Sequence, residues 1–224
     1  MLPLVQKYFP DLTPSQLEKL AQLAALTRET NERINLISRN DIIHLETRHL
    51  LHSLAAHRHF RPAKNARVAD IGTGGGFPGL PLAILNPQAT FTLIDSIAKK
   101  TRALADTAQK LGLQNIRILT ARVETLRERY DYIFGRAVTA LPQFLDWTTP
   151  LLRQGAAGVP DNGILYFKGT HYREELLNDP RQPAAIHDLH AEIPDPWFAE
   201  KYLLHFPEEK LRSQISEFRT THKK

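Results

Sequence analysis

Two short apolar runs, each ending in an acid, flank a turn that has five glycines in eight residues. Residues 68–79 read Val-Ala-Asp-Ile-Gly-Thr-Gly-Gly-Gly-Phe-Pro-Gly, so the first run leads through Asp70 into the turn. The second run, 91–94, is followed by Asp95, nineteen residues after Gly76. A buried parallel strand, a tight glycine turn and an acid at the tip of the next strand are typical of an adenosine-binding site in an α/β sheet.

Strand and helix patterns alternate after residue 66, which indicates a Rossmann-like α/β fold with a doubly wound, mostly parallel sheet. A Pro-rich segment separates two further apolar stretches near the C-terminus, which we expect to close the sheet as an antiparallel hairpin. The predicted strands are 67–71, 90–95, 115–119, 130–136 and 163–168, the helices 78–85, 97–111, 124–129 and 141–152, and the hairpin strands 185–191 and 200–206.

The N-terminal third has a helical pattern. Apolar residues recur at helical spacing over 14–37, where Thr13 is the expected cap, and over 41–60, where Asn40 is the expected cap. The polar segment 61–67 contains a proline and marks a junction. We therefore predict a helical extension, residues 1–66, packed on a core domain, residues 67–224.

Composition excludes several classes of protein. The 224 residues include no cysteine, which excludes disulfides and thiolate chemistry and suits a reducing cytoplasm. No apolar run of about 18 residues and no secretory leader are present, so we expect a cytoplasmic protein without a membrane partner. Histidine pairs such as His49 with His52 and His187 with His190 lack the further ligands that zinc requires, so we expect no metal. We also expect a monomer.

The positive charge is concentrated before the glycine turn. Residues 1–67 hold ten Lys/Arg and six Asp/Glu, whereas the rest of the chain holds 19 and 18. A basic appendage beside a near-neutral domain suggests a polyanionic partner, and a solvated helical surface explains the same charges almost as well.

Two cofactor patterns overlap at the glycine turn. Gly74, Gly76 and Gly79 fit the dinucleotide pattern G-x-G-x-x-G, and Asp70 with Gly72, Gly74 and Gly76 fits D-x-G-x-G-x-G, the pattern of S-adenosylmethionine-dependent methyltransferases. An acid before the turn would repel a pyrophosphate, whereas it would attract the ammonium and sulfonium of S-adenosylmethionine. The sequence therefore favours the methyl donor, with Asp95 accepting hydrogen bonds from the ribose hydroxyls.

Two later segments reach the same edge of the predicted sheet. Residues 120–124, after the strand 115–119, are placed to flank the adenine. Arg136 ends the strand 130–136 and is expected beside the transferable methyl, although pairing with a surface acid is the simpler interpretation. Because arginine does not deprotonate, we assign Arg136 a role in positioning the substrate and find no candidate general base.

Between about residues 28 and 170 the chain resembles a known family, the bacterial small-subunit ribosomal RNA (guanine-N7) methyltransferase G family, also called glucose-inhibited division protein B. The glycine turn with its Gly-Phe-Pro-Gly ending and the upstream helical elements are far more specific than a bare glycine motif. The resemblance rests on residues 31–38, 49–54, 70–81, 93–96, 99–100, 122–124, 135–137 and 168–169.

The resemblance implies a class I methyltransferase fold and transfer of a methyl group from S-adenosylmethionine to N7 of one guanine in a loop of 16S ribosomal RNA, with the RNA or the small subunit as partner. We expect the donor to contact Asp70, Gly72, Gly74, Phe77, Asp95, Val123, Glu124 and Arg136. We expect Lys99, Lys100, Arg102 and Lys168 to contact RNA phosphates.

The sequence is also compatible with three other functions. The first alternative is a methyltransferase that acts on a small molecule or a protein, which the basic N-terminal third opposes only mildly. A nicotinamide-dependent oxidoreductase is disfavoured by Asp70. A non-enzymatic RNA-binding module that retains the fold is the third.

Overall fold

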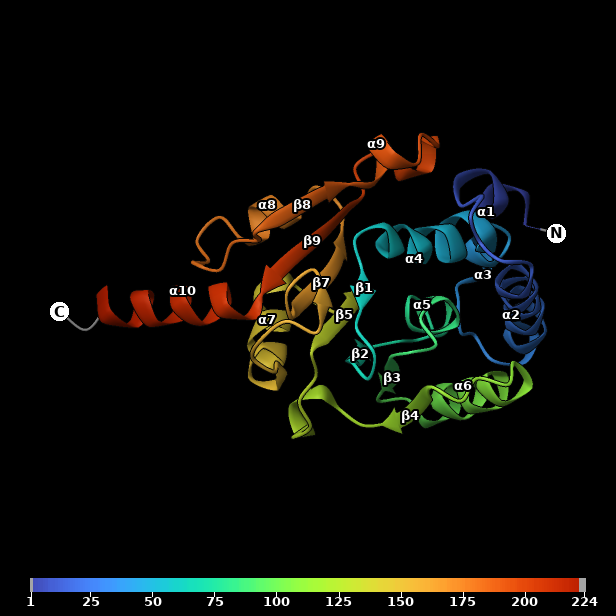
Figure 1. Ribbon diagram of the computed structural model, residues 1–224, viewed down its shortest axis with the longest axis horizontal. Helices are drawn as coiled ribbons and strands as arrows, with labels where there is room; N and C mark the ends of the chain where they lie inside the picture. Colours follow the sequence, from blue (N-terminus) through green and yellow to red (C-terminus); the bar gives the residue numbers. More distant parts are fainter. Residues whose placement is uncertain (1, 222–224) are drawn as a thin grey trace.

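A seven-stranded sheet forms the middle layer of the computed structural model, which describes residues 2–221 and the side chains up to residue 215 (Figure 1). The strand order is β4-β3-β2-β5-β7-β9-β8. The strands are β2 (Arg67–Ile71), β3 (Thr90–Asp95), β4 (Ile116–Thr120), β5 (Tyr132–Arg136), β7 (Gly163–Lys168), β8 (Ala185–Asp188) and β9 (Tyr202–Pro207).

The five strands from β4 to β7 are parallel, and β9 runs antiparallel to both of its neighbours, β7 and β8. This arrangement confirms the predicted mostly parallel sheet with a closing antiparallel hairpin. Asp70 pairs with Leu93 and Phe134, and Asp95 pairs with Thr120. The carboxyl ends of β2, β3, β4 and β5 therefore meet at one edge of the sheet.

Helices cover both faces of the sheet. Figure 1 shows α2, α4, α5 and α6 gathered on one side of the strands and α7 on the other. Among the residues described, no helix is both long enough and apolar enough to cross a bilayer. The helices are α1 (Pro3–Tyr8), α2 (Pro14–Arg33), α3 (Arg39–Ile42), α4 (His52–Ala55), α5 (Gly79–Leu85), α6 (Ala98–Lys110), α7 (Leu141–Thr148), α8 (Tyr172–Glu175), α9 (Leu189–Glu192) and α10 (Glu208–Thr221).

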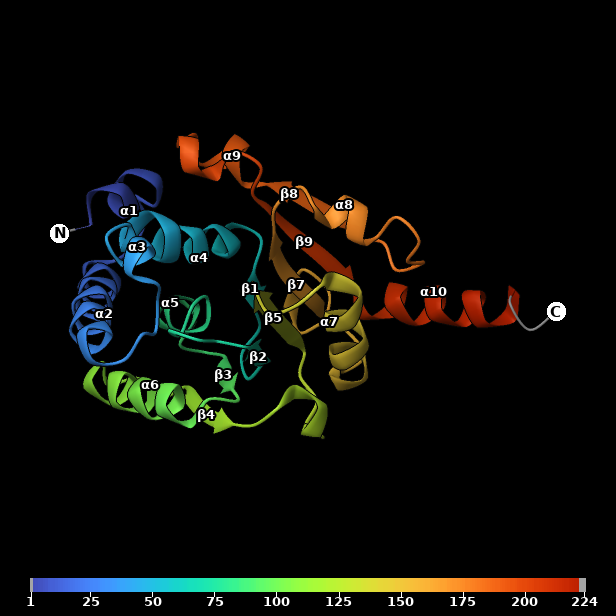
Figure 2. The ribbon, with the colours of Figure 1, turned by 180° about the vertical axis from the view of Figure 1, so that it is seen from behind.

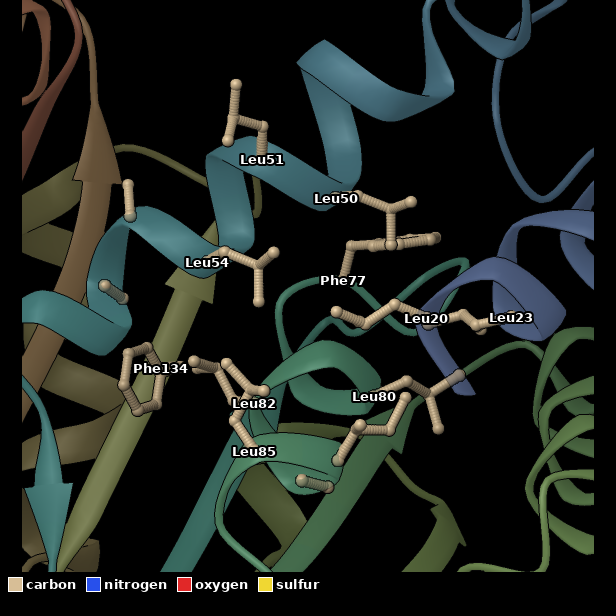
Figure 3. Close-up of a cluster of buried hydrophobic side chains, with 14 of the residues drawn as sticks. Leu20, Leu23, Leu50, Leu51, Leu54, Phe77, Leu80, Leu82, Leu85 and Phe134 are labelled. Atoms are coloured by element: carbon tan, nitrogen blue, oxygen red, sulfur yellow. The ribbon is translucent and has the colours of Figure 1, made fainter. Parts of the chain in front are cut away.

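Alternation along the strands separates two apolar clusters, because successive side chains of a strand point to opposite faces. Val68 and Phe134 belong to the cluster that includes the N-terminal helices, and Ala69 and Ile133 belong to the cluster under α7. Figure 3 shows leucines of α2, α4 and α5 within the first cluster, together with Phe77 and Phe134. The N-terminal helices thus share one core with the sheet.

The bounds of the two N-terminal helices differ from the predicted 14–37 and 41–60. Thr13 caps α2 as expected, but α2 ends at Arg33, because the Asn31 side chain binds the backbone N–H groups of residues 36 and 37 and holds them in a turn. Ser38, not Asn40, caps the next helix, α3. The rest of the predicted 41–60 helix contains a π-helical turn, η1 (Glu46–Leu51), before α4.

The predicted helix 124–129 is only a single 3₁₀ turn, Val123–Thr125. The chain here leaves β4 at the sheet edge and enters β5 beyond β3 and β2. Extended chain spans about twice the distance per residue that a helix does. The connection is therefore extended after the 3₁₀ turn.

Candidate functional site

A cavity of about 470 Å³ opens at the carboxyl ends of the parallel strands. Its walls come from the glycine turn, from the ends of β3, β4 and β5, and from two segments of the N-terminal helical region (Figure 2 shows these elements from behind). The lining residues are Leu36, Ile37, His49, residues 71–75, Phe77, residues 94–97, Lys100, residues 121–124, residues 136–138 and Trp147. The cavity therefore contains seven of the eight residues predicted to contact the donor, all but Asp70.

Asp95 connects the tip of β3 to the glycine turn. Its Oδ2 accepts a hydrogen bond from the Gly74 N–H at 3.0 Å, and its Oδ1 accepts one from the Ile97 N–H at 2.9 Å. Each carboxylate oxygen has a further lone pair, so the group can also accept from a ligand in the cavity. Gly72 has a φ of +68°, and a Cβ there would lie 2.9 Å from Val138 Cγ2. The turn therefore needs glycine at this position.

Asp70 lies behind the glycine turn rather than in the cavity, which corrects the expectation that it contacts the donor. Its Oδ2 accepts hydrogen bonds from the Thr73 hydroxyl at 2.6 Å and from the Gly79 N–H at 2.9 Å. The side chain is fully buried, and its Oδ1 has no hydrogen-bond partner among the residues described. Asp70 therefore holds the two ends of the turn together, and its charge acts on the cavity only at a distance.

Burial raises the pKa of Asp70 to about 6, against the hydrogen bonds from Thr73 and Gly79, which lower it. Because the folded pKa lies above the unfolded value of 3.8, the folded state binds the proton more tightly, and stability rises as the pH falls from about 6 to about 4. We expect the free energy of unfolding of the wild type, relative to Asp70→Asn, to rise by about 2 kcal/mol over this window. Urea unfolding of both proteins at several pH values measures this difference; a constant difference would contradict the raised pKa.

The N-terminal region supplies one wall of the cavity through a turn fixed by Asn31. The Asn31 Oδ1 accepts hydrogen bonds from the N–H groups of Leu36 and Ile37, each at 2.9 Å. Asn31 is itself buried, so this turn does not depend on water for its hydrogen bonds. The side chains of Leu36 and Ile37, which this turn positions, line the cavity.

Arg136 ends β5 and is held in place by η1 and α4. Its Nη2 lies 2.9 Å from His49 Nδ1, and its Nη1 lies 3.4 Å from His52 Nδ1 and donates to the Arg48 carbonyl at 3.1 Å. The guanidinium also lies 5.9 Å from the centre of the Phe77 ring. Arg136 is therefore not the surface arginine paired with an acid that the sequence allowed.

The two imidazoles act as neutral acceptors. Burial, followed by the Arg136 charge, lowers the pKa of His49 to about 3 and places the pKa of His52 well below its usual value. Burial lowers the pKa of Arg136 to about 10, so the guanidinium stays charged at neutral pH. Arg136 is thus a cation held in place at the cavity wall, where Lys100 and Arg122 also lie. Its guanidinium has five N–H groups, so some remain beyond the three contacts.

The four residues expected to bind RNA differ in accessibility. Lys99 and Arg102 are exposed on α6, and Lys100 lines the cavity. Lys168 does not fit the expectation: its Nζ lies 2.7 and 2.8 Å from the two carboxylate oxygens of Glu175, and its side chain is only 15% exposed. Since Glu175 also accepts from the Leu141 N–H at 2.6 Å, Lys168 fixes the start of α7.

Sequence reasoning missed several walls of the cavity. His49 belongs to one of the motifs of the resemblance but was not assigned to the donor site, and Trp147 carries no local signal because it reaches the cavity from α7, outside the expected motifs. The contact between His49 and Arg136 joins residues 87 positions apart. The available signal for His49 was its place in the motif 49–54, which the resemblance includes.

The sequence matches one family model over residues 16–195, described as rRNA small subunit methyltransferase G. Two similar proteins carry the name ribosomal RNA small subunit methyltransferase G. The protein of Flavobacterium johnsoniae is 41% identical over 203 residues, covering 91% of this chain and 96% of that protein. The protein of Porphyromonas gingivalis is 38% identical over 205 residues, covering 91% of this chain and 92% of that protein.

Two solved structures of methyltransferases have a similar fold at low sequence identity. Geranyl diphosphate C-methyltransferase from Streptomyces coelicolor superposes with a TM-score of 0.56 at 11% identity, over 86% of this chain and 97% of that one. A SAM-dependent methyltransferase from Aquifex aeolicus superposes with a TM-score of 0.50 at 13% identity, over 69% of this chain and 88% of that one. These likenesses support the class I methyltransferase fold.

Proposed function

Because this chain belongs to the rRNA small subunit methyltransferase G family, we propose that it transfers a methyl group from S-adenosylmethionine to N7 of a guanine in 16S ribosomal RNA. The observation that carries the proposal is the cavity at the carboxyl edge of the sheet, where Asp95, the glycine turn and Arg136 converge. The sequence-derived alternatives, a small-molecule or protein substrate among them, gain no support from this geometry.

The residues around the cavity suit S-adenosylmethionine. Asp95 has free lone pairs for the two ribose hydroxyls, and Val123 and Glu124 begin a helical turn whose first N–H groups are free of partners within that turn. Gly72 and Gly74 let the backbone approach the methionine portion closely. We propose that these groups hold the donor, with Phe77 closing the cavity near Arg136.

The reaction requires positioning rather than proton transfer. S-adenosylmethionine supplies an electrophilic methyl group, and guanine N7 carries an in-plane lone pair and no proton to remove. The protein must therefore align the guanine with the methyl and exclude water. Arg136 is the residue we assign to this task, because its fixed guanidinium can donate to guanine O6 or to a neighbouring phosphate. No residue is assigned as a general base.

RNA reaches this cavity across a basic rim. We propose that Lys99 and Arg102, exposed on α6, and Lys100 at the cavity contact backbone phosphates. The helices of residues 1–66 would act as an extension that completes the site rather than as an independent unit, because their side chains share the core of the sheet. A loop guanine is a suitable target, since a base outside a stack reaches a pocket at lower cost.

The test is methylation of small-subunit RNA in vitro. Purified protein is incubated with tritiated S-adenosylmethionine and 30S subunits, or deproteinised 16S RNA, from a strain that lacks this methyltransferase. We expect label at N7 of a single guanine, and we expect the rate to fall with added salt because phosphate contacts release counterions.

Two outcomes would contradict the proposal. Label in protein or small molecules, with none in RNA, would support the alternative substrate classes. Donor binding without transfer to RNA or subunits would support a non-enzymatic RNA-binding module. The Asp95→Ala variant serves as the negative control in every reaction.

A further inference from the structure

A cluster of two imidazoles and a carboxylate lies outside the cavity. His59 follows a 3₁₀ turn, Ala56–Arg58, His187 lies on β8, and Glu192 ends α9. One ligating atom from each residue lies within 4.8 Å of the other two. None of the three residues lines the proposed donor cavity.

The contacts within the cluster are unusually close. His59 Nε2 lies 2.5 Å from Glu192 Oε1, and the rings of His59 and His187 stack with their centres 3.6 Å apart. A neutral imidazole keeps one unprotonated ring nitrogen, the atom with which histidine binds a metal ion.

Glu192 is fixed from its other side by Arg58. The Arg58 Nη1 donates to the Glu192 backbone carbonyl at 3.0 Å and lies 3.7 Å from Oε2, which is buried and has no hydrogen-bond partner among the residues described. The same guanidinium donates to the Tyr8 carbonyl at 2.8 Å. The carboxylate is therefore held in place with Oε1 directed at the histidines.

We propose that His59, His187 and Glu192 bind one divalent transition-metal ion. Two imidazoles and one carboxylate are a ligand set that zinc uses with a water molecule at the fourth position. Binding requires that the imidazole nitrogens and the carboxylate oxygen that face the ion carry no proton. This site departs from the expectation of no metal: the fold brings a carboxylate and two histidines together although His59 and His187 lie 128 residues apart.

The position of the cluster indicates a structural role for the metal. β8 is the last strand of the sheet and pairs with only one neighbour, β9. His59 precedes β1 (Arg61–Pro62), at the end of the N-terminal helical region. A metal at this cluster would tie the edge strand and α9 to that region, and would stabilise the folded state by mass action.

The proposal is tested on the full chain after removal of metal with EDTA. Calorimetric titration with ZnCl₂ is expected to show one ion bound per chain with a dissociation constant below about 10 μM, and zinc is expected to raise the Tm. Titration with CoCl₂ is expected to give the visible absorption of a four-coordinate site. His187→Ala and Glu192→Gln are each expected to weaken binding at least tenfold.

His171→Ala is the matched control, because His171 and Glu174 form an exposed pair, 3.4 Å apart, and no third ligand lies beside them among the residues the structure describes. This variant is expected to bind zinc as the wild type does. Absence of binding up to 1 mM ZnCl₂, or unchanged binding in His187→Ala, would overturn the proposal. Methyl transfer plays no part in these measurements, so their failure leaves the proposed function standing.

Discussion

Asp95→Ala is expected to weaken S-adenosylmethionine binding by about a hundredfold, as measured by titration calorimetry. The carboxylate is the acceptor proposed for the ribose hydroxyls, and hydrogen bonds to a charged group contribute about 1.5–3 kcal/mol each. It also accepts from the Gly74 and Ile97 N–H groups, so its removal loosens the glycine turn as well. Both effects lower the affinity for the donor.

Two further variants separate these effects. Asp95→Asn keeps one carbonyl acceptor and is expected to bind the donor with intermediate affinity. Asp106→Ala removes an exposed acid of α6 and is expected to leave donor affinity unchanged. Equal affinity in wild type and Asp95→Ala would exclude the ribose assignment.

Arg136→Ala is expected to lower the rate of methyl transfer to RNA by at least a hundredfold, with a smaller effect on donor affinity. Its guanidinium is fixed by two neutral imidazoles and a carbonyl, so it meets the guanine without reorganisation. Arg136→Lys is expected to be almost as impaired, because a single ammonium cannot reproduce this fork of donors. Single-turnover rates and calorimetry distinguish transfer from binding.

Arg33→Ala is the control, since this exposed arginine at the end of α2 pairs only with Glu29 on the same helix. Its transfer rate is expected to match that of the wild type. A wild-type rate in Arg136→Ala would remove the positioning role. A loss of donor affinity as large as the loss of rate would instead assign Arg136 to donor binding alone.

The sheet and the glycine turn could be predicted because their signals are local. Each central strand is a short apolar run bounded by turn residues, and β2, β3 and β7 have the predicted bounds. The acid at the end of β3 was identified for the same reason: strand ends in a parallel sheet converge at one edge. Sequence position therefore determined that Asp95 faces the cavity.

Other features depend on contacts between distant segments. Asp70 has the same sequence context as Asp95, yet the chain folds the glycine turn over it, so it supports the turn from behind. Lys168 is held by Glu175, whose position depends on the path of the chain after β7. The pairing of Arg136 with His49 needs η1 to lie across the end of β5. No local pattern encodes these three contacts.

The turn held by Asn31 has a consequence for any dissection of this protein. Leu36, Ile37 and His49 belong to chain that precedes the first central strand, yet they form part of the cavity wall. A fragment that starts at residue 67 would keep Arg136 but lose the groups that shield and orient it. Truncation before residue 67 would thus leave the cavity without one of its walls. A change of donor specificity by mutation would have to include residues of the N-terminal helices as well as residues of the sheet domain.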